Sequence, residues 1–406
     1  MRKIGLLKNS IQEYAWGSRT AIPELLGQSV PADKPQAELW MGAHPKAPSQ
    51  VLADGLWRSL PEVIEESPEE TLGQEVAARF SNKLPFLFKV LAAAKPLSIQ
   101  AHPNKEQAGQ GFARENGLGI PLDAGHRNYR DDNHKPEIIC ALTPFWALNG
   151  FRKIEETLSL LEEARIPGLV EIVSFLRSHP NRDGLKKFFN HLMTTDSGKQ
   201  GKIVEQAVNY AEKRTHEEPV WTWMIKLNEE YPGDMGVLSP IFLNLIRLEP
   251  QQAMYLPAGE LHGYLEGVGI ELMANSDNVL RGGLTPKHID VQELLTVLNF
   301  TDGGLNILSP ENLTPGEAFY STEAEEFVLS VIRINKAAPF SSPRDRSVEM
   351  MMCTEGEVSV TDLSAGDITR LTRGVSIMVP AAVEQYSIEG DGILYKAAVP
   401  LTSTRH

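Results

Sequence analysis

The stretch L-E-P-Q-Q-A-M-Y-L-P-A-G-E-L-H, residues 248–262, indicates the fold because a similar stretch occurs later in the chain. Residues 371–385 read L-T-R-G-V-S-I-M-V-P-A-A-V-E-Q, and both stretches lead from a strand-like run into Pro-Ala and a small residue. A polar side chain follows three positions later, His262 in the first copy and Gln385 in the second. The repeat predicts two related β-rich lobes that differ at one shared polar position.

The pattern Pro-x-Gly-x-x-His after a strand resembles the second sequence motif of the cupin superfamily. This resemblance implies a jelly roll with a metal inside the barrel for the first lobe, and a jelly roll without a metal for the second. The expected fold class is therefore mainly β, with two cupin-type jelly-roll lobes and an α-helical domain inserted into the first.

The pattern of apolar residues changes twice along the chain. Short apolar and β-branched runs separated by Gly and Pro give way to helical periodicity, and strand-like runs return after Tyr231-Pro232-Gly233. Antiparallel strands are favoured over a parallel sheet, because the later strand-like runs follow one another with only turns between them. The predicted units are a discontinuous first lobe (1–152 and 236–318), a helical insert (153–235) and a second lobe without metal (319–406).

Composition excludes several classes of partner. Among 406 residues the formal net charge is −14, which argues against binding to nucleic acid or to an anionic membrane surface. No run approaches the roughly 20 apolar residues that span a bilayer, and no signal peptide is recognisable. Cys140 and Cys353 are too few for a disulfide framework and are expected to be buried and inert, which favours the cytoplasm. We expect a monomer.

Residues 97–104, L-S-I-Q-A-H-P-N, turn a polar face toward one side of a predicted strand. Ser98, Gln100 and His102 alternate with apolar residues, and alternate side chains of a strand share a face. A single histidine on a strand is more often a hydrogen-bonded core residue than a ligand. Glu137 and His262 also lie at strand edges, however, and with Gln100 and His102 they supply donors that suit a divalent ion of borderline softness.

Residues 275–288, N-S-D-N-V-L-R-G-G-L-T-P-K-H, place two cations among turn-forming residues. One interpretation is a solvent loop in which Arg281 pairs with Asp277. The other is an anion site, because an acidic protein that binds an anionic substrate must concentrate its cations locally. Closeness to His262 in the sequence favours the second interpretation, with Arg281 and Lys287 facing the same cavity as the metal.

Seven segments in the same order resemble the type I mannose-6-phosphate isomerases. They cover most of residues 1–290, and Gly282 departs from the alanine expected after the arginine. The segments are I-Q-E-Y-A-W-G-S (11–18), A-E-L-W-M-G-A-H-P (37–45), L-P-F-L-F-K-V-L (84–91), L-S-I-Q-A-H-P (97–103), N-H-K-P-E (133–137), P-A-G-E-L-H (257–262) and S-D-N-V-L-R-G-G-L-T-P-K (276–287).

The resemblance implies one Zn²⁺ per chain, bound by Gln100, His102, Glu137 and His262, with Arg281 as a catalytic residue. The implied reaction interconverts D-mannose 6-phosphate and D-fructose 6-phosphate through a cis-enediol, by proton transfer between C1 and C2 of the sugar phosphate. Residues at family positions leave the proton-transfer base open among Glu271, His134, Lys135 and Asp277. Ser98, Lys135 and Lys287 are expected to hold the phosphate or the sugar hydroxyls, and Lys89 is expected beside the site.

Two alternatives belong to other classes. A cupin oxygenase that uses iron would usually rest on more histidines than this chain offers. A non-catalytic cupin that binds a sugar phosphate would lack a ligand or the arginine, and all of them are present.

Overall fold

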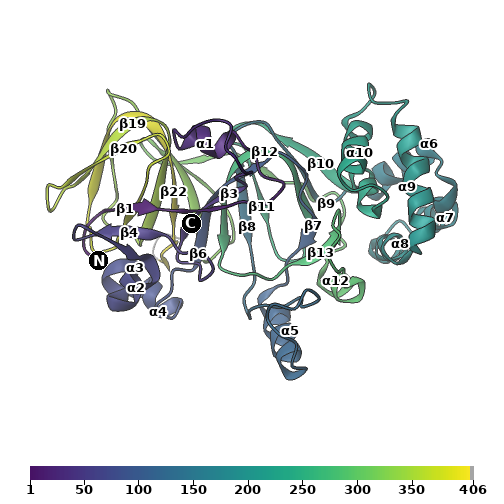
Figure 1. Cartoon of the computed structure of the whole chain (residues 1–406), viewed down its shortest axis with the longest axis horizontal. Coiled ribbons are helices and arrows are strands. Elements are labelled where there is room, and N and C mark those ends of the chain that lie inside the picture. The colour runs from purple at the N-terminus through teal and green to yellow at the C-terminus, as the bar shows by residue number, and fades with distance from the viewer. Residues whose placement is uncertain (403–406) are drawn as a thin grey trace.

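A computed structural model of the chain describes residues 1–402. Two β-rich lobes lie side by side, and a group of helices is attached to the outer end of one lobe (Figure 1). The described residues form two eleven-stranded sheets in which the paired strands are antiparallel. None of the helices in residues 1–402 is long and apolar enough to cross a membrane.

The sheet of the first lobe runs in the order β14-β11-β8-β12-β6-β3-β2, with β7, β9, β10 and β13 attached beside it. Strand β12 pairs with β7 and β9 near its start and with β6 and β8 near its end, so one strand joins both halves of the lobe. Every residue of β6 and β8 is buried, as expected for strands covered on both faces. The strands are β2 (Ser10–Gln12), β3 (Glu38–Gly42), β6 (Phe86–Ala93), β7 (Ile99–Ala101), β8 (Glu137–Ala141), β9 (Phe145–Phe151), β10 (Leu243–Leu248), β11 (Ala253–Leu256), β12 (His262–Ala274), β13 (Leu280–Gly283) and β14 (Ile307–Leu308).

The sheet of the second lobe runs β15-β16-β17-β22-β19-β21-β1-β4-β5, with β18 on β22 and β20 on β19. The two repeat stretches form β11 and β21 ahead of their Pro-Ala pairs, as predicted. The strands are β1 (Gly5–Lys8), β4 (Gln50–Ala53), β5 (Leu56–Ser59), β15 (Glu311–Thr314), β16 (Glu317–Tyr320), β17 (Val328–Ile334), β18 (Phe340–Ser341), β19 (Glu349–Asp362), β20 (Ile368–Thr372), β21 (Ser376–Val379) and β22 (Tyr386–Ala398).

Three strands from the first 60 residues lie in the sheet of the C-terminal lobe. Strand β1 pairs with β21 through Gly5 and Met378, and β4 and β5 follow it at the edge. The predicted division into 1–152 with 236–318, 153–235 and 319–406 stays a prediction. Strands β1, β4, β5 and β15 and the start of β16 cross it, because they lie in the sheet of the C-terminal lobe. Residues 403–406 of the predicted second lobe lie outside the described residues.

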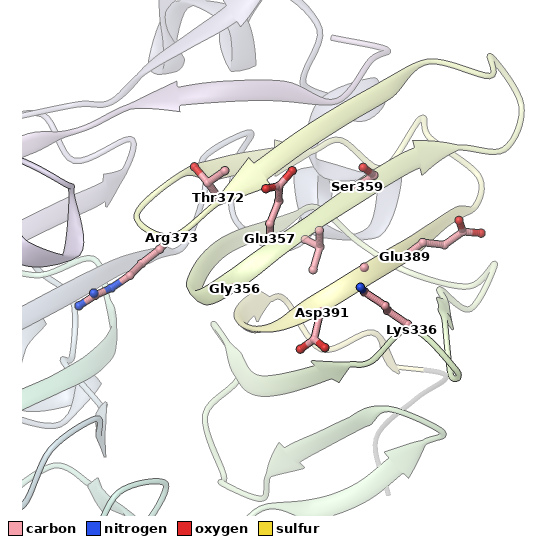
Figure 2. A pocket seen from close by; sticks show the side chains of 10 residues that line it. Lys336, Gly356, Glu357, Ser359, Thr372, Arg373, Glu389 and Asp391 are labelled. Carbon is pink, nitrogen blue, oxygen red and sulfur yellow. The ribbon is translucent and has the colours of Figure 1, made fainter.

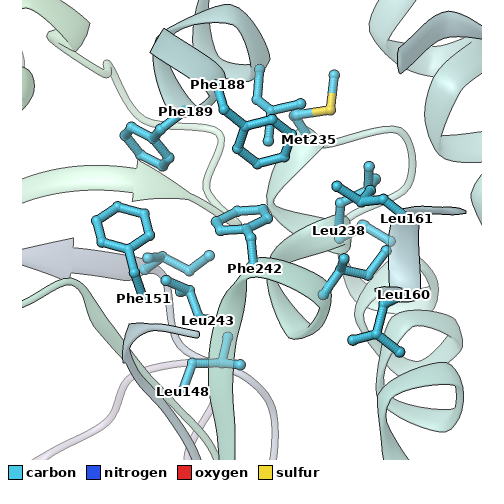
Figure 3. Close-up of a cluster of buried hydrophobic side chains, with 14 of the residues drawn as sticks. Leu148, Phe151, Leu160, Leu161, Phe188, Phe189, Met235, Leu238, Phe242 and Leu243 are labelled. Carbon is cyan, nitrogen blue, oxygen red and sulfur yellow. The ribbon is translucent and has the colours of Figure 1, made fainter. Parts of the chain in front are cut away.

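The helical insertion contains α6 (Ile154–Ala164), η1 (Pro167–Leu169), α7 (Val170–Ser178), α8 (Arg182–Thr194), α9 (Ser197–Ala211), α10 (Pro219–Glu230), η2 (Met235–Leu238) and α11 (Ser239–Phe242). A hydrophobic cluster fixes it to β9 and β10 (Figure 3). The ring of Phe151 on β9 meets the edge of Phe189 on α8, and Phe242 meets both Phe188 and Phe189. Burial of each such ring stabilises the fold by roughly 1.5–3 kcal/mol, so these contacts hold the insertion against the outer end of the lobe.

The remaining helices are α1 (Ala21–Leu25), α2 (Leu60–Glu66), α3 (Pro68–Leu72), α4 (Gln74–Arg79), α5 (Lys105–Gly117) and α12 (Val291–Val297). Helix α5 begins just after His102. The Asn104 side chain accepts a hydrogen bond from the Gln107 backbone, and the Gln107 side chain accepts one from the Asn104 backbone. This capping box satisfies two backbone N–H groups and fixes the start of helix α5 at Lys105.

Candidate functional site

Three side chains from different strands meet in the interior of the first lobe. His102 follows β7, Glu137 begins β8 and His262 begins β12, and each is about 1% exposed. Glu137 Oε2 lies 3.5 Å from His102 Nε2 and 3.4 Å from His262 Nε2. Strand pairing brings them together. The pairing of β12 with β7 places His262 opposite Gln100, and the pairing of β11 with β8 places Leu256, six residues before His262, opposite Glu137.

The facing atoms of this cluster have no hydrogen-bond partner. His102 Nε2, Glu137 Oε2 and His262 Nε2 are all buried and unsatisfied. On the outer sides of the rings, His102 Nδ1 lies 2.7 Å from the Asn278 carbonyl and His262 Nδ1 lies 3.0 Å from the Glu260 carbonyl. A carbonyl only accepts, so each Nδ1 donates and each Nε2 is left with a lone pair aimed inward.

Three convergent lone pairs in a buried site match the donor set of a zinc centre. Burial, and then the Lys135 cation, lower the pKa of His102 to about 4. Burial alone would raise the pKa of Glu137, but Lys135 and His102 outweigh it and hold that pKa well below its usual value. At neutral pH the His102 ring is therefore neutral and the Glu137 carboxylate charged, which are the forms that bind metal.

The predicted strand face is present. Ser98 and Gln100 are half-buried, while Ile99 and Ala101 between them are buried. Gln100 lies opposite both His262 on β12 and Arg281 on β13, so its amide belongs to the same part of the lobe as the three ligand atoms. Its role as a fourth ligand, and that of Ser98 as a substrate contact, stay predictions.

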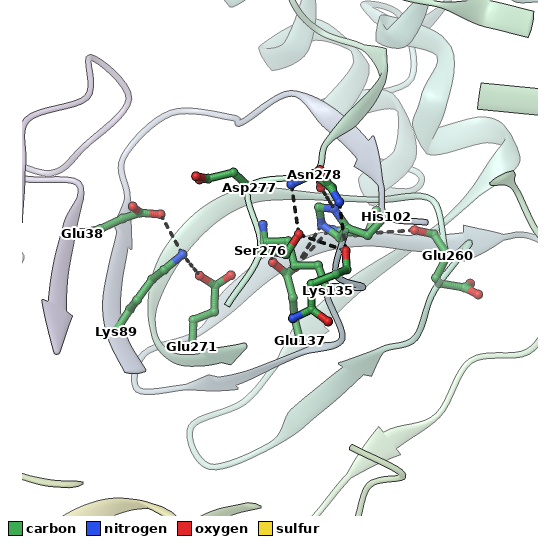
Figure 4. A network of polar contacts seen from close by, with 12 residues as sticks. Glu38, Lys89, His102, Lys135, Glu137, Glu260, Glu271, Ser276, Asp277 and Asn278 are labelled. Carbon is green, nitrogen blue, oxygen red and sulfur yellow. Dashed lines mark hydrogen bonds and ion pairs between the residues drawn. The ribbon is translucent and has the colours of Figure 1, made fainter. Parts of the chain in front are cut away.

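A second group of buried charges lies beside the cluster, and Figure 4 shows both. Lys89 Nζ lies 2.7 Å from a Glu271 oxygen and 3.7 Å from a Glu38 oxygen, because β6 pairs with β12 and β3 at Lys89. Burial would lower the pKa of Lys89, but Glu271 and Glu38 raise it above its usual value, so the ammonium keeps its proton. Burial raises the pKa of Glu271.

The other predicted base candidates differ in their surroundings. Lys135 is buried, and its Nζ lies 2.8 Å from Glu137 Oε1. His134 Nε2 lies 2.6 Å from Glu326 of the C-terminal lobe. Asp277 lies 2.8 Å from Lys46 Nζ and 3.7 Å from His44 Nε2. His134 and Asp277 are thus held in ion pairs outside the three-ligand cluster.

Three cations gather near the cluster without anionic partners. Burial, and then Arg130, lower the pKa of Arg281. Burial, followed by Arg281 and Arg130, lowers the pKa of Lys287, so the three groups lie close enough to repel one another. In the part of the chain that the structure describes, none of them forms an ion pair with a carboxylate, and the alternative of an Arg281–Asp277 pair is wrong because Asp277 pairs with Lys46.

Sequence reasoning missed Arg130, and the signal that could have found it is its place in N-Y-R-D-D-N, just ahead of N-H-K-P-E. Gly282, the one departure from the family pattern, leaves little space. A Cβ there would lie 2.9 Å from Leu261 Cδ1, and the end of a flexible side chain can move to admit it.

The C-terminal lobe carries no comparable cluster of His, Cys, Asp and Glu among its described residues. Gln385, the counterpart of His262, donates a hydrogen bond to the Ser342 carbonyl. An open hollow of about 690 Å³ on this lobe is lined by charges of both signs, among them Lys336, Glu389 and Asp391 (Figure 2).

Comparisons with known proteins all point to the same family. Residues 4–154 match a family model described as the catalytic domain of phosphomannose isomerase type I, and residues 169–243 match the helical insertion domain of the same family. The mannose-6-phosphate isomerase of Escherichia coli K12 is 40% identical over 390 residues, which cover 96% of this chain and 97% of the relative. The human enzyme of that name is 38% identical over 322 residues, which cover 73% of each chain.

Solved structures give the same picture. A lysine-to-alanine mutant of phosphomannose isomerase from Salmonella typhimurium superposes with a TM-score of 0.90 at 38% identity, covering 98% of this chain and all of the other. A zinc-bound mannose 6-phosphate isomerase gives 0.90 at 39% identity over 98% of this chain and 100% of that structure.

Replacing one ligand tests the cluster. His262→Ala removes one of three convergent lone pairs, so zinc affinity should fall by more than the roughly 10–100-fold that loss of an outer partner costs. Competition against a chromogenic chelator measures it. His179→Ala, the same change at an exposed ring in the insertion, serves as the control, and equal zinc affinity in the two variants would contradict the assignment.

Proposed function

The chain belongs to the type I phosphomannose isomerases, and from that premise we propose that it interconverts D-mannose 6-phosphate and D-fructose 6-phosphate. The observation that carries the proposal is the buried convergence of His102, Glu137 and His262 on unsatisfied inner atoms. The names of the relatives agree with this activity, and none of them supports an oxygenase or a non-catalytic sugar-phosphate binder.

The reaction moves a proton between C1 and C2 of the open-chain sugar through a cis-enediol. Gln100, His102, Glu137 and His262 would hold the zinc ion. When bound, zinc supplies a Lewis acid and a template that orients the two sugar oxygens. The protein must add a base for the proton and positive charge for the phosphate.

Glu271 is the base that the surroundings favour. Its carboxylate is buried next to the ligand cluster, and burial raises its pKa toward the range that suits a general base at neutral pH. Lys89 fixes its orientation with a 2.7 Å ion pair. Lys135 forms an ion pair with the proposed ligand Glu137 and would donate to a sugar oxygen. His134 and Asp277 are less suited, because their ion pairs are with Glu326 and Lys46, outside the three-ligand cluster.

Arg130 and Lys287 would bind the phosphate, and Arg281, the expected catalytic residue, lies beside them. Mutual repulsion makes their grouping costly until an anion binds among them, and a protein with net charge −14 has no other reason to gather unpaired cations here. Arg281 lies opposite Gln100 in the β13–β7 pairing, so the phosphate would lie within one sugar length of the metal ligands.

Compartment and assembly remain predictions. Cys140 and Cys353 are free and buried, in keeping with the expected cytoplasmic location. The expected monomer is tested by sedimentation.

Metal removal tests the function itself. The purified chain should convert mannose 6-phosphate to fructose 6-phosphate, lose that activity on treatment with a chelator, and regain it when zinc is added. A coupled enzymatic assay for fructose 6-phosphate measures it. No turnover after zinc restoration would contradict the isomerase, and full turnover in chelator would contradict its metal dependence.

Neutralising the proposed base should slow the chemical step. Glu271→Gln keeps the shape of the side chain but loses the proton acceptor, so kcat should fall by roughly 10²–10⁴-fold while KM changes little. Glu38→Gln is the matched control, because it removes the other carboxylate facing Lys89. Equal losses in the two variants would mean that only the buried charge balance matters.

Removing cations should weaken phosphate binding selectively. Arg130→Met and Lys287→Met should each raise the KM for mannose 6-phosphate by roughly 10–100-fold, since a hydrogen bond to a charged group contributes about 1.5–3 kcal/mol. Turnover of unphosphorylated mannose should not change. Arg247→Met, at a surface ion pair with Glu249, controls for loss of charge. An equal loss with both sugars would contradict the phosphate assignment.

A further inference from the structure

Asn278 is a fully buried residue that contacts both the three-ligand cluster and the segment that carries Arg130, without being a predicted ligand or a cation itself. It is 0% exposed and lies three residues ahead of Arg281 on β13. In Figure 4 it lies beside His102, Ser276 and Lys135.

The backbone of Asn278 faces the metal ligands. Its carbonyl accepts the 2.7 Å hydrogen bond from His102 Nδ1, which leaves the lone pair of His102 Nε2 facing Glu137. Its N–H donates to Ser276 Oγ at 3.2 Å, and Ser276 Oγ in turn donates to Asp131 Oδ1 at 2.8 Å. The position of that carbonyl, and with it the aim of the His102 ring, depends on how residue 278 is held.

The side chain of Asn278 is bound entirely to the segment 130–133. Oδ1 accepts from the backbone N–H of Arg130 at 2.6 Å and of Asp131 at 3.2 Å. Nδ2 donates to the carbonyls of Asp131 and Asn133, at 2.9 Å each. All the hydrogen-bonding capacity of one amide is used on a stretch that begins with a phosphate-site cation and leads, four residues after Asn133, to the metal ligand Glu137.

We propose that Asn278 is a positioning residue that sets the metal ligands and the phosphate-binding cations at a fixed separation. Its carbonyl orients His102, and its amide places Arg130 and the start of the segment that carries Lys135 and Glu137. A buried asparagine can do both because backbone and side chain hydrogen-bond in different directions from one Cα. An aldose phosphate must span the distance between the zinc ion and the phosphate-binding cations. This separation therefore determines whether both ends of the substrate bind at the same time.

Two substitutions separate the parts of this role. Asn278→Asp keeps the acceptor for Arg130 N–H but turns an oxygen toward two carbonyls and the Asp131 carboxylate. Asn278→Ala removes the amide altogether. Ser276→Ala is a milder third variant that keeps Asn278 and removes only the hydroxyl beneath its N–H.

The matched control is Asn244→Ala. The Asn244 amide also donates to backbone carbonyls of the same lobe, those of Asn149, Gly150 and Phe151, but contacts neither residue 102 nor the segment 130–133. It therefore reports the cost of losing a bridging amide that touches neither His102 nor the segment 130–133.

The test uses two binding affinities and does not depend on catalytic activity. Zinc affinity is measured by chelator competition, and affinity for inorganic phosphate by calorimetric titration of the zinc-loaded protein, at a temperature where circular dichroism shows each variant folded. Both Asn278 variants should lose roughly 10–100-fold in zinc affinity and should also bind phosphate more weakly, with Ser276→Ala between them and the parent. The parent and Asn244→Ala should bind both probes equally.

Unchanged zinc and phosphate affinities in the Asn278 variants, or the same losses in Asn244→Ala, would overturn the proposal. Loss of zinc affinity alone would also overturn it, because the two halves would then not be coupled. If the Asn278 variants do not fold, Ser276→Ala decides by the same two affinities. The proposal rests on the proposed function for its phosphate site. If the unsubstituted protein had no isomerase activity, that function would be refuted, but the zinc affinities of the variants would still show whether Asn278 positions the metal ligands.

Discussion

The site depends on two hydrogen bonds that point outward from it. Each imidazole gives its Nδ1 proton to a backbone carbonyl, His102 to Asn278 and His262 to Glu260, and so presents Nε2 without a proton to the interior. Buried polar atoms without partners are rare in folded proteins because each costs free energy. Three of them facing one another, with Glu137 Oε2 as the third, have a common explanation in a bound cation.

The fold supplies this arrangement by strand pairing. Strand β12 begins with His262, runs opposite β7 at its start and opposite β6 and β8 further on, and so carries a ligand at one end and Glu271 at the other. The Lys89 ammonium balances the two carboxylates that the neighbouring strands present to it. Of the cations proposed to bind the phosphate or lie beside it, Arg281 is on β13 and Lys287 follows it, and Arg130 lies in the segment ahead of β8 to which the Asn278 amide is hydrogen-bonded.

Much of this arrangement could be predicted from the sequence, because the patterns that indicate it lie within short segments of the chain. Alternation in L-S-I-Q-A-H gives the polar face of a strand, and periodicity separates the helical insertion from the sheets. What could not be predicted depends on contacts between distant segments. The ion pair of His134 with Glu326 and the pairing of β1 with β21 have no signal in the sequence around these residues. Asn278 belongs to the same class, since its partners His102 and the segment 130–133 lie about 145 to 176 positions away.

The central claim is that three inner atoms share one metal ion. Crystallography of the zinc-loaded protein, with data collected on both sides of the zinc absorption edge, tests it most directly. We expect one anomalous peak per chain at about 2.0–2.2 Å from His102 Nε2, His262 Nε2 and a Glu137 oxygen. A peak at another place in the chain, or none between these three side chains, would contradict it.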